Sequence, residues 1–223
     1  MGSIADNLNA ILQTIPEGVS LVAVSKFHDA DAVRQAYDCG QRRFGESRVQ
    51  ELLAKQPQLP ADIEWHFIGH LQTNKVRSLI PHVAMIESVD SERLLRLIND
   101  ESARAGVVTK VLLQLHVAAE ETKFGMTPDE MLAFFASGVH KSLTSVKIRG
   151  VMGMATNTDD MNRRRQDFCL IADTFRQIKS DASLGLSDFD VISMGMSDDY
   201  LTAIDCGATL VRIGTDIFGP RQY

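Results

Sequence analysis

Short runs of β-branched and apolar residues alternate along the chain with longer segments whose apolar residues recur every three or four positions. The runs are bounded by polar turns and are too short for typical helices, so they predict β-strands. The segments between them predict helices that bury one face. Eight strands are expected in this way, at residues 21–26, 43–47, 64–69, 84–89, 109–117, 147–154, 190–196 and 210–215.

The expected helices are marked by their periodicity and by their ends. Phe168, Ile171 and Phe175 recur at helical spacing before the seventh expected strand. An additional amphipathic helix precedes the first strand, and its apolar face includes Leu8 and Ile11. Several glycines lie where a helix would end in a left-handed residue, namely Gly40, Gly106, Gly138 and Gly207.

Eight strands that alternate with helices fit two architectures, an open doubly wound sheet and a closed eight-stranded parallel barrel. The strand count favours the barrel, and 223 residues lies within the barrel's usual range of about 200 residues upward. The first βα turn reads SKFHDAD and lacks the G-x-G-x-x-G motif of dinucleotide-binding sheets. No linker or low-complexity segment divides the chain. We therefore expect residues 1–223 to form one α/β domain, a (β/α)8 TIM barrel with an extra N-terminal helix.

The chain is acidic overall, with 23 Lys and Arg against 29 Asp and Glu, a formal charge of −6. This charge gives no general attraction to nucleic acid or to an anionic membrane, so a bound anion needs a local site. No stretch resembles a membrane span or a signal peptide. The three cysteines are widely spaced and form no C-x-x-C pair, which fits a reducing compartment. We therefore expect a cytoplasmic protein.

Two turns rich in small residues follow the last two expected strands, where (β/α)8 barrels commonly bind phosphate. The first turn contains Ser193, Gly195 and Ser197, and we expect the Ser197 side chain to cap the following helix. The second contains Gly214 and Thr215, which offer close backbone approach and a hydroxyl group. Each turn alone is equally typical of ordinary helix capping. Their occurrence after both strands predicts a phosphate-binding site.

The first expected strand ends in Lys26, which strand alternation places on the same face as Val22 and Val24. If that face points inward, the amine lies at the barrel mouth, where partial burial favours its neutral, nucleophilic form. A solvated lysine on the rim is the simpler alternative. Combined with a phosphate site, Lys26 indicates a phosphorylated carbonyl compound held as a Schiff base.

Other polar groups suggest no site of their own. His66 and His70 are four residues apart but span an expected strand and its turn, and no histidine or cysteine set has zinc-ligand spacing. The arginine triplet at 163–165 fits a solvated helix face, with a docking patch as the alternative. Cys39 and Cys206 lie near expected helix C-termini, which do not favour a thiolate. We therefore expect no metal site and no catalytic cysteine.

Seven motifs, in order along the chain, resemble the pyridoxal phosphate homeostasis protein family, which is related to the barrel domain of alanine racemases. They read LVAVSK, RRFGES followed by VQE, WHFIGHLQTNK, EETKFGM, KIRGVMGMA, SMGMSDDYLTAI and VRIGTDIFG. The resemblance runs nearly from end to end. It implies a barrel that binds pyridoxal 5′-phosphate (PLP), and it identifies Lys26, in AVSK, as the residue that forms the Schiff base.

The resemblance also assigns roles to other residues. Both turns described above match the phosphate-binding segments of the family, and Arg212 matches the arginine that faces the pyridine nitrogen. Because a guanidinium only donates hydrogen bonds, it keeps that nitrogen unprotonated, which makes the ring a weaker electron sink. One position departs from the family pattern. Ser47 stands where the family usually has Asn after Phe-Gly-Glu, and a contact from this shorter side chain would run through water.

The implied function is that of a carrier that holds PLP reversibly on Lys26 and acts in its intracellular homeostasis. The alternative is a PLP-dependent, racemase-like enzyme. Alanine racemases use as the opposite base a tyrosine brought by a second, β-rich domain of a partner subunit. Here the chain ends soon after Thr215, and we expect Tyr37, Tyr200 and Tyr223 to be poorly placed for that role. A Schiff-base aldolase is least favoured, because its lysine usually lies on a later strand. We expect a monomer that makes transient contacts with PLP-dependent enzymes, without nucleic-acid or membrane partners.

Overall fold

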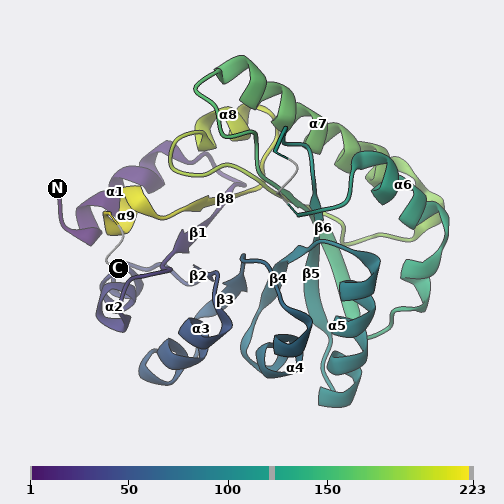
Figure 1. The fold of residues 1–223 in the computed structure, drawn as a ribbon. Helices are drawn as coiled ribbons and strands as arrows, with labels where there is room; N and C mark the ends of the chain where they lie inside the picture. The colour runs from purple at the N-terminus through teal and green to yellow at the C-terminus, as the bar shows by residue number, and fades with distance from the viewer. Residues whose placement is uncertain (1, 121–123, 221–223) are drawn as a thin grey trace.

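A closed barrel of parallel strands forms the centre of the computed structural model, which describes residues 2–120 and 124–220. Each strand pairs with the next one along the chain, and the last pairs with the first (Figure 1). The expected closed barrel is confirmed, and the open sheet is wrong. The strands are β1 (Ser20–Val24), β2 (Arg43–Glu46), β3 (Glu64–Phe67), β4 (Met85–Val89), β5 (Thr109–Leu115), β6 (Val146–Gly153), β7 (Val191–Ser193) and β8 (Leu210–Ile213).

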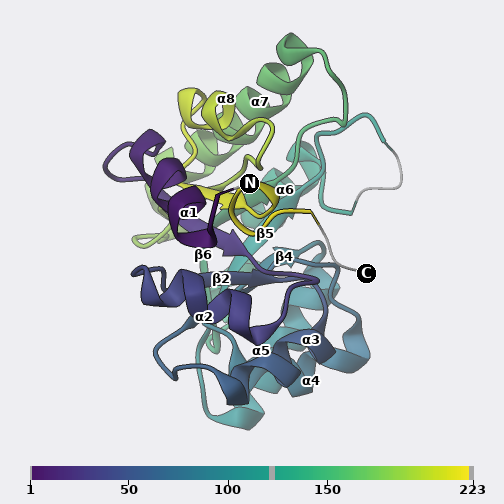
Figure 2. The same cartoon turned by 90° about the vertical axis from the view of Figure 1, so that its left-hand side faces the viewer.

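Helices surround the barrel, as the two views in Figures 1 and 2 show. Short 3-10 helices connect some of them to the strands, at η1 (Gln56–Gln58), η2 (Thr73–Lys75), η3 (Ile80–His82), η4 (Val139–Ser142) and η5 (Ala182–Leu184). In the described part of the chain, every helix falls short of what crossing a membrane requires in length and apolarity. The α-helices are α1 (Ile4–Thr14), α2 (Ala30–Asp38), α3 (Val49–Lys55), α4 (Val76–Leu79), α5 (Glu92–Ala105), α6 (Pro128–Ala136), α7 (Met161–Ser180), α8 (Tyr200–Asp205) and α9 (Thr215–Phe218).

The extra N-terminal helix is present as α1. It begins with a capping box, in which the Ser3 hydroxyl accepts from the Asp6 amide and the Asp6 carboxylate accepts from the Ser3 amide. Its apolar face buries Leu8 completely. The Asn7 side-chain amide donates to the Ile217 carbonyl at 3.1 Å, which ties α1 to α9. Figure 2 shows these two helices side by side.

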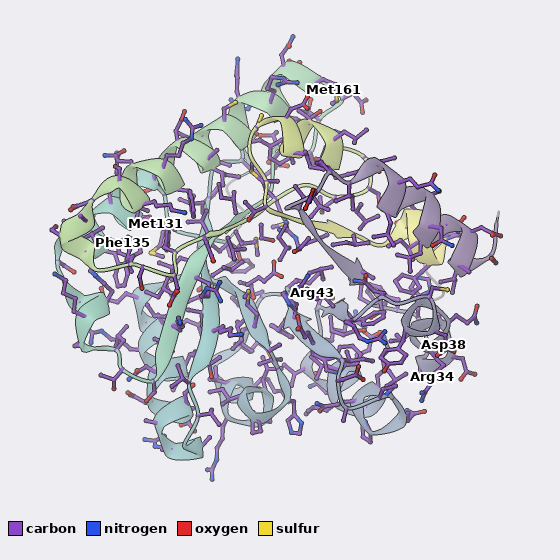
Figure 3. The ribbon with its side chains drawn as sticks, turned by 180° about the vertical axis from the view of Figure 1, so that it is seen from behind. Arg34, Asp38, Arg43, Met131, Phe135 and Met161 are labelled. Atoms are coloured by element: carbon purple, nitrogen blue, oxygen red, sulfur yellow. The ribbon has the colours of Figure 1, made fainter. Side chains whose placement is uncertain are left out.

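The core lies between the outer surface of the barrel and the inner faces of the helices. On α6, Met131 and Phe135 are one turn apart and point toward the barrel, whereas Arg34 and Asp38 on α2 point outward (Figure 3). The Phe135 ring packs edge-on against the Phe189 ring at 5.8 Å. Each such buried side chain stabilises the fold by roughly 1.5–3 kcal/mol. The core therefore holds the barrel rigid beneath the loops at its carboxyl end.

The strands end earlier than the hydrophobic pattern predicts. β1 stops at Val24 instead of residue 26, and β7 stops at Ser193 instead of residue 196. Beyond β1, Lys26 lines a cavity, and beyond β7 Met196 lines the same cavity, so alternation alone overestimates the strand length. The helix ends agree better with expectation. All of the expected cap glycines have positive φ, and Gly106 ends α5 with φ 68°.

Candidate functional site

A cavity of about 230 Å³ opens at the carboxyl ends of the strands, the face on which (β/α)8 barrels carry their active sites. It combines cationic groups, hydroxyls and apolar side chains, so it can hold a ligand that is part anion and part planar ring. Its lining residues come from β1 and the turn after it, from the residue after β3, from β6 and the residue after it, from the segment after β7, and from β8 and the segment after it. They are Val24, Lys26, His28, Ile68, Met152, Met154, Met196, Ser197, Asp198, Arg212, Gly214, Thr215 and Gly219.

Lys26 lines this cavity from the turn between β1 and α2. The expectation that it ends the first strand is wrong, because β1 ends at Val24 and the chain then turns. The predicted face is nevertheless right, since Val24 lines the same cavity. The next residue, Phe27, has φ 68°, a left-handed conformation that is uncommon outside glycine. The amine is therefore presented by a bent loop.

The segment after β7 contributes Ser197 to the cavity but leaves two other candidates behind its wall. Ser193 is fully buried. Gly195 has φ 92°, and a Cβ there would lie 2.6 Å from the Ala203 Cβ, so glycine allows this turn to pack on α8. Among the seven cofactor-binding candidates, Ser193 and Gly195 therefore support the site from behind. The five that line the cavity are Lys26, Ser197, Arg212, Gly214 and Thr215.

The expected helix cap at Ser197 is wrong. α8 begins at Tyr200, with Asp199 in the N-cap position. The Asp199 carboxylate accepts from the Met196 amide at 2.7 Å and closes the turn before the helix starts. Burial raises the pKa of Asp199, although the Met196 amide and nearby arginines act in the opposite direction. The Ser197 side chain is therefore not needed as a cap and lies at the cavity.

The segment after β8, the strand next to β7, also lines the cavity. Gly214 precedes α9, which begins at Thr215. A Cβ on Gly214 would lie 3.0 Å from the Val24 carbonyl oxygen, so this glycine lets β8 and β1 meet closely beside the cavity. Thr215 is exposed and offers its hydroxyl at the rim. The two turns expected to form a phosphate site thus face one cavity.

Arg212 belongs to a buried polar cluster inside the barrel, here called the Arg212 cluster: Arg212, Ser193, Glu87 and His66. Arg212 donates to the Ser193 hydroxyl at 2.5 Å and to the Gly153 carbonyl at 3.0 Å. The Ser193 hydroxyl donates to Glu87 Oε2 at 2.6 Å. His66 Nδ1 lies 2.6 Å from Glu87 Oε1. This chain of contacts holds the guanidinium in one position at the base of the cavity.

The charges of this cluster are balanced. Burial alone raises the pKa of Glu87, but its hydrogen bond and charge interaction with His66, followed by Arg212 and Ser193, bring it below its usual value. Burial lowers the pKa of Arg212, and the charges of Glu87 and Asp199 act against that effect. The cluster therefore pairs a buried carboxylate with a buried guanidinium.

Sequence reasoning missed Glu87 and the cavity residue His28, and it assigned no role to His66. Burial, followed by the positive charge of Lys55, lowers the pKa of His28. A signal for Glu87 was present, because it is a charged residue in the middle of the apolar strand MIESV. Such a residue inside a barrel strand needs buried partners. The sequence gives no indication of which partners these are.

The remaining polar candidates lie apart from the cavity. His70 Nδ1 lies 3.1 Å from Asp90, so the two histidines of the third motif have different partners. Cys169 and Cys206 place their sulfur atoms 3.3 Å apart between α7 and α8. Burial and the contact with Cys169 raise the pKa of the Cys206 thiol to about 11. A thiol of this kind is a poor nucleophile at neutral pH.

Ser47 follows β2 and lies outside the described lining of the cavity. The Ser47 backbone lies close to Gly69, where a Cβ would collide with the Ser47 carbonyl oxygen. Gly69 therefore allows the loops after β2 and β3 to pack together. The structure gives the Ser47 hydroxyl no described partner, so the contact through water stays a prediction.

Comparisons with known proteins identify the family. The family model described as "Alanine racemase, N-terminal domain" matches residues 1–222. The pyridoxal phosphate homeostasis protein of Pasteurella multocida is 37% identical over 236 residues, which cover 99% of each chain. PipY of Synechococcus elongatus PCC7942, solved without PLP, is 35% identical and has a TM-score of 0.92 over 97% of this chain and 100% of that chain. PipY with PLP bound has a TM-score of 0.88.

A more distant likeness concerns the fold alone. An alanine racemase from Streptomyces coelicolor A3(2) is 20% identical, with a TM-score of 0.73 over 96% of this chain and 57% of that chain. The chain thus belongs to the family of alanine racemase N-terminal barrel domains. Its relatives at 34–39% identity within this family are pyridoxal phosphate homeostasis proteins, which confirms the resemblance carried by its motifs.

Proposed function

We propose that this chain holds pyridoxal 5′-phosphate as a Schiff base on Lys26 and acts in intracellular PLP homeostasis. The observation that carries the proposal is that Lys26, Arg212 and the Thr215 hydroxyl line one cavity at the carboxyl end of the barrel. The relatives named as homeostasis proteins, and the PipY structure with PLP bound, support the same cofactor. When bound, PLP supplies an aldehyde that reacts with a primary amine.

The cavity has the groups that such a cofactor needs. The hydroxyls of Ser197 and Thr215, with the backbone of their turns, provide hydrogen-bond donors for a phosphate. Ile68, Met152 and Met154 provide an apolar wall for a planar ring. In this proposal hydroxyls and backbone amides hold the phosphate locally, because the net charge of the chain does not attract anions.

Arg212 has a separate role in this proposal. Its guanidinium is buried, only donates hydrogen bonds, and is held by Ser193 and the Gly153 carbonyl. A pyridine nitrogen that faces it accepts a hydrogen bond and stays unprotonated, so the ring withdraws electrons weakly. This setting suits a protein that stores the cofactor better than one that stabilises carbanions.

We further propose a carrier role without catalysis, in the cytoplasm, by a monomeric single domain in transient contact with PLP-dependent enzymes. The described tyrosines support the absence of racemase chemistry. The Tyr37 hydroxyl donates to Asp62 on the surface, and the Tyr200 hydroxyl lies 2.8 Å from Thr14. Neither lines the described cavity. Tyr223, the third candidate for an opposite base, lies outside the described residues.

A spectroscopic titration tests the proposal. The purified apoprotein should develop a saturable visible absorption band with PLP, and Lys26→Ala should lose this band. Lys141→Met is a matched control, because Lys141 is exposed on η4, before β6, and donates to the Ser183 carbonyl on η5, before β7. Both residues precede their strands, whereas the cavity lies at the carboxyl ends of the strands. A band of equal intensity in Lys26→Ala would overturn the assignment.

A chirality assay tests the carrier role separately. The PLP-loaded protein is incubated with L- and D-amino acids, and the optical rotation or the enantiomer ratio is followed. We expect no turnover above that of free PLP. Sustained racemisation that depends on Lys26 would replace the carrier by an enzyme.

A further inference from the structure

The turn that presents Lys26 is held from outside the cavity. Four residues form a buried charged group between β1, β2 and α3, here called the Lys55 cluster: Lys55, Glu46, Glu51 and Ser25. The Lys55 side chain is 7% exposed, and that of Glu46 is fully buried. None of the four lines the described cavity. The cluster therefore acts on the site through the backbone.

One ammonium group is linked to both neighbours of Lys26, directly to Ser25 and through Glu51 to Phe27. Lys55 Nζ donates to the Ser25 carbonyl at 2.8 Å, directly before Lys26. It also donates to Glu51 Oε1 at 2.8 Å, and the same oxygen accepts from the amide of Phe27 at 2.6 Å, directly after Lys26. The peptide groups on both sides of Lys26 are thus tied to Lys55.

The other contacts of the cluster complete the restraint. Lys55 Nζ donates its third hydrogen bond to Glu46 Oε1 at 2.7 Å, so all three ammonium protons are engaged. The Ser25 hydroxyl donates to the same oxygen at 2.7 Å. With its protons engaged, Lys55 has none left to donate to a ligand.

The turn needs such a restraint because its backbone is strained. Phe27 has φ 68°, a value that residues other than Gly, Asn, Asp and His rarely adopt. Such a conformation persists where surrounding contacts enforce it. The Arg48 guanidinium lies 4.7 Å above the Phe27 ring and adds a contact from the start of α3. Burying an ion pair is a costly way to gain stability, since apolar side chains of similar volume often stabilise a protein equally well.

We infer that Lys55 is a positioning residue for Lys26: with Glu46 and Glu51 it fixes the 25–27 turn so that the Lys26 amine faces an aldehyde in the cavity. This inference rests on the proposed function. In the step concerned, the neutral Lys26 amine and the aldehyde carbon form a C=N bond. The two amine protons and the aldehyde oxygen leave as water, and no oxidant or reductant is involved. Lys55 takes no part in these bond changes and sets only the position of the attacking nitrogen.

The test separates positioning from general damage to the cavity. Lys55→Met and the control Lys141→Met are compared with the unmodified chain for the rate at which PLP becomes trapped on the protein by borohydride. Binding of pyridoxine 5′-phosphate, which has an alcohol in place of the aldehyde, is measured in parallel. We expect Lys55→Met to slow trapping on the order of 10- to 100-fold, because small misplacements of a reacting group have effects of this size.

The same variant should bind pyridoxine 5′-phosphate within about twofold of the unmodified chain, because misplacing the amine leaves the phosphate and ring contacts in place. Equal trapping rates in Lys55→Met and the unmodified chain would overturn the inference. A parallel loss of PLP trapping and pyridoxine 5′-phosphate binding in Lys55→Met would also overturn it, as would label on Lys55 in the unmodified chain. If the unmodified chain traps no PLP at Lys26, the proposed function fails instead, and the two failures are distinguishable.

A second pair of variants covers the case in which Lys55→Met does not fold. Glu51 is partly exposed, and Glu51→Ala removes the acceptor of the Phe27 amide while Lys55 keeps Glu46 and the Ser25 carbonyl. Glu51→Gln keeps an acceptor at that position. Slower trapping in Glu51→Ala, with recovery in Glu51→Gln, supports the inference. Rates in Glu51→Ala equal to those of the unmodified chain contradict it.

Discussion

Two buried charged groups flank the same cavity, and they differ in how completely their carboxylates are paired. The Arg212 cluster lies inside the barrel, and both oxygens of Glu87 have a hydrogen-bond partner. The Lys55 cluster lies between the strands and α3. Among the residues that the structure describes, Glu46 Oε2 is buried without a partner, while Oε1 has two. Both carboxylates are fully buried and both have a cationic neighbour.

The difference in pairing gives the two carboxylates opposite pKa shifts. The partners of Glu87 outweigh its burial, so its pKa is lowered. For Glu46, burial outweighs Lys55 and Ser25 and raises the pKa to about 7. Opposite charge nearby is therefore not sufficient to keep the pKa of a buried carboxyl low, and at Glu46 the like charge of Glu51 adds to the rise. We therefore expect the Arg212 cluster to keep its charges near neutral pH and the Lys55 cluster to respond to pH.

Removal of Glu87 should produce the largest loss of stability. Glu87→Ala leaves the buried Arg212 without its anion, and breaking such a pair costs about 3–5 kcal/mol of unfolding free energy. Urea denaturation measures the loss. Glu92→Ala, which removes an exposed partner of Arg96, is the control and should cost about 1 kcal/mol or less. Similar losses in the two variants would show that the Arg212 cluster is not a rigid support.

The pH dependence of stability should reveal Glu46. Its pKa is raised on folding, so between pH 4.5 and about 7 the folded state binds more protons than the unfolded state. The contribution of Glu46 to stability is then present at low pH and is lost as the pH rises toward 7, by about 1–3 kcal/mol. Urea denaturation from pH 5 to pH 8 measures this change.

The variant Glu46→Gln provides the reference for that experiment, because it resembles the protonated carboxyl and does not titrate. The difference in unfolding free energy between the unmodified chain and Glu46→Gln should fall as the pH rises. A difference that stays constant or rises would mean that Glu46 is ionised throughout, as Glu87 is expected to be. In that case the two clusters would not differ in the way described.

Two serines allow a smaller, matched comparison. Ser193 donates to Glu87 and accepts from Arg212, whereas Ser25 donates to Glu46 alone. Hydrogen bonds to charged groups contribute about 1.5–3 kcal/mol and neutral ones about 0.5–1.5 kcal/mol. Ser193→Ala should therefore destabilise the protein more than Ser25→Ala, by about 1 kcal/mol, in thermal or urea denaturation. The reverse order would indicate that the Lys55 cluster is the more tightly coupled of the two.

The barrel could be predicted from the sequence because its signal is local. Each strand and helix shows its own periodicity, and the eight strands close in chain order. Lys26 could be found because it lies two residues after the end of such a strand. The least accurate predictions concern the loops. Ser197 was expected to cap α8, but Asp199 occupies the N-cap position and its side chain closes the turn before the helix.

The clusters could not be predicted because their contacts join distant parts of the chain. Ser193 and Glu87 are 106 positions apart, and Lys55 reaches the Ser25 carbonyl across 30 positions. Only the presence of charged residues within apolar segments was visible beforehand. Charge alone gives neither the partners of a buried carboxylate nor the number of hydrogen bonds that it accepts.

The central claim, that Lys26 holds the cofactor, is tested most directly by locating the trapped label. The protein is saturated with PLP, reduced with borohydride, digested, and mapped by mass spectrometry. We expect the phosphopyridoxyl group on the peptide containing Lys26, and only background label in Lys26→Ala. Label of equal amount on another lysine, or undiminished labelling of Lys26→Ala, would contradict it.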